Sequence, residues 1–163
     1  MKKDIVDELL CQWANERPKM NVSALGIVVR VQMLGKLLQQ RTSDALKRHG
    51  LKHWEYDVLS VLRRQGEPFE MQATEIARAA LLTTGAMTTR IDGLEEKGLV
   101  RRRQGKVDRR SVLVRLTRKG KSVVDAAIDS RLESANQTLS KMTLKDRRKV
   151  AASLRQLLLN LEN

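Results

Sequence analysis

Apolar residues recur at helical spacing along most of the chain, and glycine or proline interrupts the pattern at intervals. Spacings of three and four between apolar side chains are typical of a helix with one buried face. The helices that this spacing predicts cover residues 4–17, 21–50, 53–65, 72–82, 83–98, 117–139 and a last segment from 143 onwards. The pattern therefore predicts a mainly α-helical protein.

After Gly98 the spacing of apolar residues changes from 3.6 to 2, which is typical of strands. Residues 99–103 and 111–116 form two such runs, joined by a short polar segment, and so predict a β-hairpin with a cationic tip. Only a short link separates the two helices before it, as in a helix-turn-helix. Helix, turn, helix and hairpin in this order predict a winged helix-turn-helix.

The helix at 83–98 has an apolar stripe on one side and short hydroxyls with an arginine on the other. Threonine is a mediocre helix former, so its repeated use on an exposed face is not explained by helix stability. Hydroxyls and guanidinium groups reach phosphates and base edges when a helix lies in a DNA groove. We therefore expect DNA contacts from Thr84, Thr88, Thr89 and Arg90.

Positive charge is concentrated in and beside the predicted hairpin. The chain carries a net charge of +13, and residues 101–121 hold ten basic side chains against a single acid, Asp108. A basic patch of this kind favours a polyanionic partner. A solvated strand edge would explain the first arginines of the hairpin, but their neighbours favour phosphate binding. The predicted contacts are Arg101, Arg103, Lys106, Arg109 and Arg110.

The residue content argues against several other classes of protein. No nucleophile with a base, glycine-rich phosphate loop or metal cluster is visible, so we expect neither an enzyme nor a cofactor. A basic RNA-binding protein usually displays aromatic side chains for stacking, and this chain has four aromatic residues. A non-specific basic nucleic-acid-binding protein stays as a remote alternative. The single cysteine and the absence of a long apolar run or signal-peptide pattern predict a cytoplasmic, nucleoid-associated protein without membrane contact.

The first and last predicted helices carry apolar faces that need a partner. The helix at 4–17 is too short to be stable alone, so its apolar face must dock on another element, and we expect a second subunit there. The last helix has a dense apolar stripe at helical spacing, best buried against another helix end. An interleaved homodimer would satisfy both helices.

Three stretches resemble the MarR family of bacterial transcription regulators: HWEYDVLSVLRRQGEP, LLTTGAMTTRIDGLEEKGLVRR and VDRRSVLVRLTRKG. The resemblance implies a homodimer that binds a palindromic operator on double-stranded DNA, usually as a repressor. It assigns dimerisation to residues 1–50 and 117–163, with 4–17 as an extra helix, and DNA binding to a winged helix-turn-helix over 51–116. It also implies that Asp108 braces Arg110, which enters the minor groove.

The segment CQWANERPKMN is similar to the extra helix of the PecS, MftR and HucR branch, whose members respond to urate. This similarity implies a ligand site formed by Trp13, Arg17, Asp57 and Arg90. The helical spacing puts Asp57 on an inward stripe and Arg90 at the edge of another, so we expect an ion pair between them. An aromatic anion could then compete with Asp57 for Arg90.

Three alternatives to urate binding stay open. The four residues could form only a structural salt bridge and a tryptophan anchor for the first helix. A different phenolic or lipophilic ligand could use the same site. Cys11 could respond to oxidation, although one branch that uses such a cysteine surrounds it with tyrosines, and Tyr56 is the single tyrosine here.

Overall fold

The computed structural model describes residues 2–80, 87–104 and 112–162, which fall into two compact units. The first unit covers Met1–Asp44 and the second covers Ala45–Asn163. Helix α2 (Ser23–Lys47) begins in the first unit, and its last turn belongs to the second. Within the described residues, no helix has the length and apolar character needed to cross a membrane.

The first unit is a helical hairpin of α1 (Ile5–Glu16) and α2. Asp4 caps α1 by accepting hydrogen bonds from the backbone N–H groups of Val6 and Asp7. Arg30 of α2 binds both carboxylates, at 2.9 Å from Asp4 and 2.7 Å from Asp7. Gly26 is buried, and a Cβ at this position would lie 2.9 Å from Leu10 Cδ1, so the glycine permits the close approach of the two helices.

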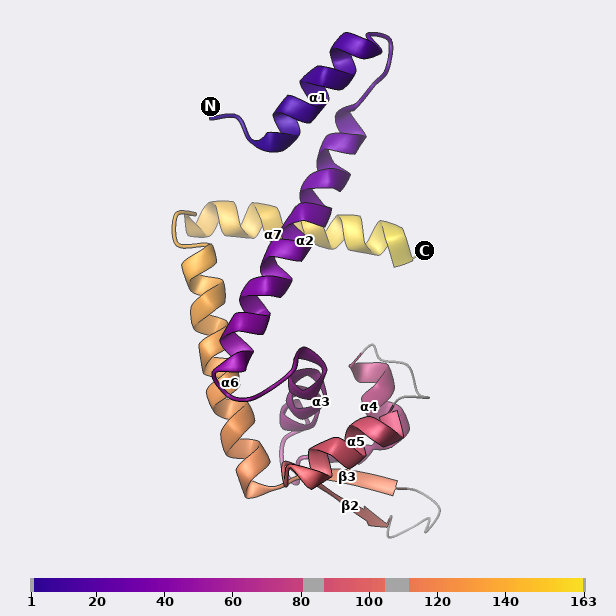
Figure 1. Cartoon of the computed structure of the whole chain (residues 1–163), viewed down its shortest axis with the longest axis vertical. Helices are drawn as coiled ribbons and strands as arrows, with labels where there is room; N and C mark the ends of the chain where they lie inside the picture. The colour runs from indigo at the N-terminus through magenta and orange to yellow at the C-terminus, as the bar shows by residue number, and fades with distance from the viewer. Residues whose placement is uncertain (1, 81–86, 105–111, 163) are drawn as a thin grey trace. The chain divides into compact units, whose positions relative to one another are not determined.

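The second unit has the predicted helix-turn-helix and wing (Figure 1). Its elements in order are α3 (His53–Arg64), β1 (Glu70–Gln72), α4 (Ala73–Ala79), α5 (Met87–Glu96), β2 (Val100–Gln104), β3 (Val112–Leu116), α6 (Arg118–Thr138) and α7 (Leu144–Glu162). The strands form an antiparallel sheet in the order β1-β3-β2. The mainly α fold with a small wing is therefore confirmed.

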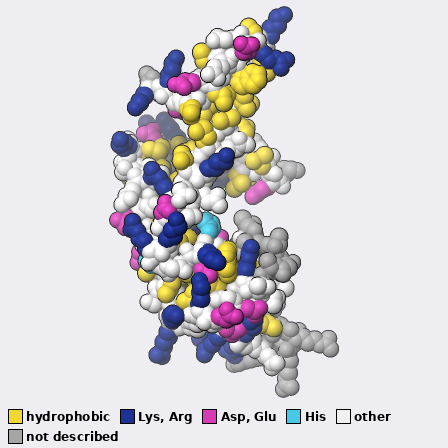
Figure 2. Space-filling view, in the orientation of Figure 1, with side chains coloured by type: hydrophobic (Ala, Val, Ile, Leu, Met, Phe, Trp, Pro, Cys, Tyr) yellow, Lys and Arg dark blue, Asp and Glu magenta, His cyan; other side chains and the backbone are white. Residues whose placement is uncertain are grey.

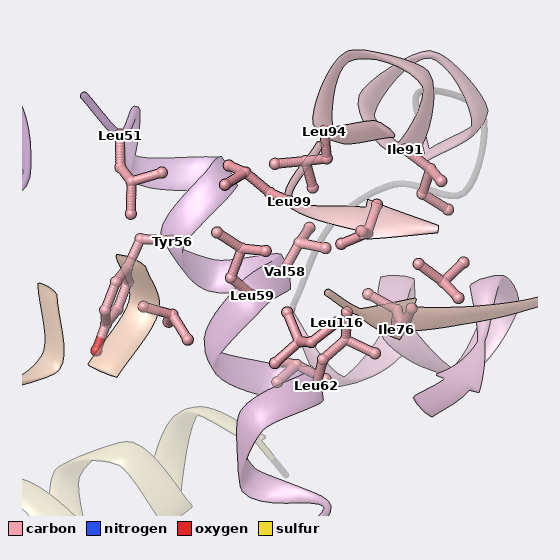
Figure 3. Close-up of a cluster of buried hydrophobic side chains, with 14 of the residues drawn as sticks. Leu51, Tyr56, Val58, Leu59, Leu62, Ile76, Ile91, Leu94, Leu99 and Leu116 are labelled. Carbon is pink, nitrogen blue, oxygen red and sulfur yellow. The ribbon is translucent and has the colours of Figure 1, made fainter. Parts of the chain in front are cut away.

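One hydrophobic core holds the helices and the sheet of the second unit together. Figure 3 shows leucine, isoleucine and valine side chains from α3, α4, α5 and β3 pointing toward one another. Its fully buried members include Val58, Leu59, Leu62, Ile76 and Leu94. Each such side chain contributes about 1.5–3 kcal/mol by leaving water. The core therefore fixes how α5 and the wing lie on α3.

Thr117 joins the wing to α6 at a crowded point. Its side chain accepts a hydrogen bond from the N–H of Gly120 at 2.9 Å, which caps α6. The same hydroxyl donates to the carbonyl of Gly98 at 2.7 Å, just after α5. The start of α6 is thus tied to the segment between α5 and β2.

The strand β1 is not predicted by the spacing of apolar residues. It has three residues, too few for an alternating pattern to be visible, and pairs with β3 from Glu70↔Arg115 to Gln72↔Leu113. Phe69 precedes it with a φ of 57°, and its carbonyl accepts a hydrogen bond from the N–H of Leu116. This partner strand comes from outside the predicted hairpin, so only the folded chain reveals it.

Candidate nucleic-acid interface

Helix α5 has the two faces that the sequence predicts. Met87, Ile91 and Leu94 are buried in the core, whereas Thr88 and Thr89 are exposed. Their hydroxyls are therefore free to meet a ligand outside the core. Thr84 lies outside the described residues.

Arg102 braces β2 against α5. Its guanidinium lies 2.6 Å from Asp92 and 2.7 Å from Glu95, and it donates to the carbonyl of Thr88 at 3.2 Å. Burial alone would lower the pKa of Arg102, but the hydrogen bonds to Asp92 and Glu95 outweigh burial and raise it. This role of Arg102 is not among the predictions from the sequence. Strand alternation offers the signal, because it directs Arg102 to the opposite side of β2 from Arg101 and Arg103.

A second ion pair holds the C-terminal end of α5 against α3. Glu55 has a side chain that is 3% exposed, and one of its oxygens lies 2.7 Å from Lys97 Nζ. Its other oxygen accepts the N–H of Lys52 at 2.8 Å and so caps α3. A buried carboxylate is stable only with such partners. Lys97 and Glu55 thus fix the end of the helix that carries the exposed threonines.

The described part of the wing carries cations in two different settings. Arg101 is exposed, while Arg103 lies 3.5 Å from Glu70 of β1. The side chain of Arg101 is therefore available to phosphate, and that of Arg103 already faces a carboxylate. The predicted contacts Lys106, Asp108, Arg109 and Arg110 lie outside the described residues.

The expected ion pair between Asp57 and Arg90 is wrong. Asp57 pairs with His53 at 2.9 Å, because the two side chains lie one turn apart on the same face of α3. The guanidinium of Arg90 lies over the ring of Trp54, 5.6 Å from its centroid, and buries its Nη1 atom without a hydrogen-bond partner. Arg90 still links α5 to α3, but through the tryptophan ring.

Asp57 lines a cavity of about 390 Å³ between α3, α4 and α6. Two arginines, Arg64 and Arg131, share the lining, and Arg131 lies over the Tyr56 ring at 4.9 Å from the centroid. Arg90 is not part of this lining. A cavity with cations, an aromatic ring and a carboxylate has suitable groups for a small polar ligand.

The remaining two predicted ligand residues belong to the first unit. Trp13 is exposed, and its carbonyl accepts a hydrogen bond at 2.8 Å from the N–H of Arg17, which caps the end of α1. Cys11 is also exposed. Among the described residues, no group of His, Cys, Asp and Glu could hold a metal ion.

A recognition helix with exposed hydroxyls, braced at both ends beside a three-stranded cationic wing, defines a DNA-binding winged helix-turn-helix protein. Residues 49–111 match the sequence profile of the MarR family. These residues resemble the MarR family, whose members are transcription regulators and not enzymes.

Comparison with known proteins agrees with this assignment. The chain is 28% identical to the HTH-type transcriptional regulator PecS of Dickeya dadantii over 149 residues, which are 91% of this chain and 90% of PecS. Two solved structures from Streptomyces coelicolor have the same fold. The MarR family regulator AbsC has a TM-score of 0.75 at 20% identity, covering 88% of this chain and 98% of AbsC. Sco3205, solved in complex with DNA, has a TM-score of 0.73 at 22% identity, covering 88% of this chain and 92% of Sco3205.

Proposed function

We propose that the protein is a homodimeric repressor that binds a palindromic operator and leaves it when a small aromatic anion binds. The observation that carries the proposal is the exposure of Thr88 and Thr89 on a helix that Arg102 and Lys97 hold in place. In a major groove, these hydroxyls would meet base edges and phosphates, and the wing would meet the adjacent minor groove. In this role the protein works on the chromosome, in the cytoplasm.

Selection of a random duplex library with the purified protein tests the DNA-binding proposal. We expect a palindromic consensus, bound more tightly than a scrambled duplex, with a log-log salt slope of about −6 to −9 if roughly 6–10 phosphates are neutralised. Thr88→Ala and Thr89→Ala should each cost about 1 kcal/mol of operator binding, and Ser153→Ala on α7 is the control. Equal affinity for palindromic, scrambled and RNA probes would contradict the proposal.

The segment that joins β2 to β3 in the sequence gives a separate test of the same proposal. Asp108 and Arg110 correspond to the Asp and Arg of the family's wing signature. Arg110→Ala should weaken operator binding by about 1–3 kcal/mol and relax discrimination in the flanking minor groove. An unchanged sequence preference in that variant would remove Arg110 from the proposed contacts.

Exposed apolar side chains on the terminal helices support the homodimer. Helix α7 has no buried residue in the single chain, and Leu154 and Leu158 are 47% and 57% exposed. Figure 2 shows further apolar side chains gathered over α1 and α2, where Ile27 and Leu34 are more than half exposed. Apolar surface of this extent on helices calls for a protein partner. We assign dimer contacts to residues 1–50 and 117–163 and DNA contacts to 51–116.

Sedimentation of the purified protein measures the dimer directly. The double variant Leu154→Lys and Leu158→Lys should sediment as a monomer and lose tight operator binding, because lysine cannot be buried there without a partner. Gln156→Lys adds a charge at a polar, exposed position on the opposite side of the same helix from Leu154 and Leu158 and should stay dimeric. A monomeric wild-type protein at micromolar concentration would contradict the homodimer.

The cavity beside Asp57 supports a ligand-binding role. Arg64 and Arg131 provide donors for an anion, and the Tyr56 ring provides an apolar wall. A ligand in this cavity would contact α3, α4 and α6, and α3 holds α5 through Glu55 and Trp54. Occupation of the cavity could therefore alter the position of α5. Trp13 and Arg17 stay predicted ligand contacts, and substitution of each residue in the urate titration would test its contact.

Titration with urate, followed by tryptophan fluorescence and operator release, tests the effector. We expect release by urate and a weaker response in Arg131→Gln, with Asp129→Asn on the exposed side of α6 as the control. No response at millimolar urate would exclude urate as the effector, and phenolic ligands would then be titrated in the same way. Release by peroxide that disappears in Cys11→Ser would instead favour redox control.

A further inference from the structure

The wing sheet has two chemically different faces. Strand alternation places Val100, Val114 and Leu116 in the core. The opposite face carries Arg101 and Arg115, which lie directly across from each other on β2 and β3. Arg102, on the same face of β2 as Val100, binds carboxylates of α5. The Arg101 and Arg115 face therefore points away from α5.

Two arginines directly opposite each other on one sheet face repel. Within the described residues, neither Arg101 nor Arg115 forms an ion pair. Glu70 of β1 lies opposite Arg115 in the strand register. Its carboxylate, however, lies 3.5 Å from the guanidinium of Arg103. The sheet thus keeps a local repulsion that an anionic partner would relieve.

The same face opens into a basic hollow of about 570 Å³. Arg101 and Arg115 line it together with Arg118 and Lys121 from the first turn of α6, and Glu67 is the one carboxylate in the lining. Lys121 is occupied by Asp125 at 2.8 Å, whereas Arg118 is exposed. We call Arg101, Arg115 and Arg118 the outer arginine face.

We propose that the outer arginine face binds backbone phosphates of the duplex that flanks the operator. Because this face points away from α5, any phosphate it meets belongs to DNA beyond the segment that α5 covers. In a dimer, two such faces would hold the flanks on both sides and lengthen the bound site. This inference rests on the proposed operator binding, and it adds contacts that read no sequence.

Binding to two probes measures the flank contacts. One probe carries only the selected palindrome, and the other adds about one helical turn, ~10 bp, of random sequence on each side. Each additional neutralised phosphate steepens the log-log salt slope by about 0.9. If the extra contact contributes nothing at 1 M salt, this slope makes the affinity about 5-fold higher at 0.15 M salt. For one or two such contacts we expect the long probe to bind about 5- to 30-fold more tightly.

The double variant Arg115→Gln and Arg118→Gln should lose this gain and the extra salt slope while binding the short probe within about 2-fold of wild type. Arg148→Gln with Lys149→Gln on α7 removes the same charge from exposed positions elsewhere and should keep the gain. Thermal unfolding checks that both variants fold.

Three results would overturn the inference: no gain from the flanks in the wild type, an unchanged gain in the Arg115 and Arg118 variant, or an equal loss in the α7 control. A wild-type protein that does not distinguish the short palindrome from a scrambled probe contradicts the proposed function itself. The two failures are therefore distinguishable.

Discussion

Gly120 sits where α6 meets the segment after α5, and it leaves no room for a side chain. A Cβ built on Gly120 would lie 2.8 Å from the carbonyl carbon of Leu99 and closer still to its oxygen. Both are backbone atoms that cannot rotate away. Gly120→Ala should therefore force α6 away from the start of β2.

The size of the effect follows from three opposing contributions. Alanine in a helix is favoured over glycine by about 1 kcal/mol. Overpacking against backbone costs about 1–3 kcal/mol, and the shift weakens the Thr117 bonds to Gly120 and Gly98, at about 1 kcal/mol each. The free energy of unfolding should thus fall by about 2–4 kcal/mol.

Urea unfolding followed by circular dichroism measures this loss, and Gly93→Ala is the matched control. Gly93 also lies in a helix, α5, but a Cβ there meets nothing within 4 Å. Gly93→Ala should therefore stabilise the protein by up to about 1 kcal/mol. If Gly120→Ala changed stability by less than about 1 kcal/mol, or followed Gly93→Ala in sign, the reasoning from close packing would be refuted.

Three other variants probe the ion pairs of the second unit. Glu55→Ala should cost about 1–3 kcal/mol in urea unfolding, because it removes the cap of α3 and the partner of Lys97, and a loss below about 0.5 kcal/mol would contradict this role. Arg102→Ala should cost at most about 1 kcal/mol of stability, since the carboxylate partners of Arg102 are more than a third exposed. The same variant should weaken operator binding, because it removes the brace on α5. Unchanged affinity for the operator would show that bracing α5 is unimportant. The hydrogen bond from Lys121, aided by Arg63, holds the pKa of Asp125 below its ordinary 3.8 against the opposing effect of burial. The stabilisation by the Asp125 carboxylate should be present above about pH 4 and lost as the pH falls through the lowered folded pKa. The gap in melting temperature between wild type and Asp125→Asn should therefore narrow from about pH 6 to about pH 3. A constant gap would contradict the assignment.

The helices and the wing were predictable because their signals are local. Apolar spacing, the Thr117 cap of α6 and the glycine after α5 all act within a few residues. Their boundaries moved by a few residues at most helix ends, as expected where the last turn competes with a cap. The three-residue β1 gave no such signal.

The pairing of charged side chains was not predictable from spacing alone. Helical spacing placed Asp57 and Arg90 near the inward faces of their helices. It did not determine which neighbouring side chain lies closest to each of them. His53 is one turn from Asp57 on the same helix, and Trp54 offers Arg90 a flat ring. Local geometry and ring packing therefore replaced the expected ion pair.

The sequence by itself determined the class of the protein: the order of helices and hairpin, the exposed threonines and the basic wing. These follow from periodicity and charge, which act along the chain. Only the tertiary structure decided which carboxylates hold Arg102 and Lys97, where the outer arginine face points and why Gly120 must lack a side chain. The physical reason is that these features depend on contacts between elements far apart in the chain, whose distances are set by core packing.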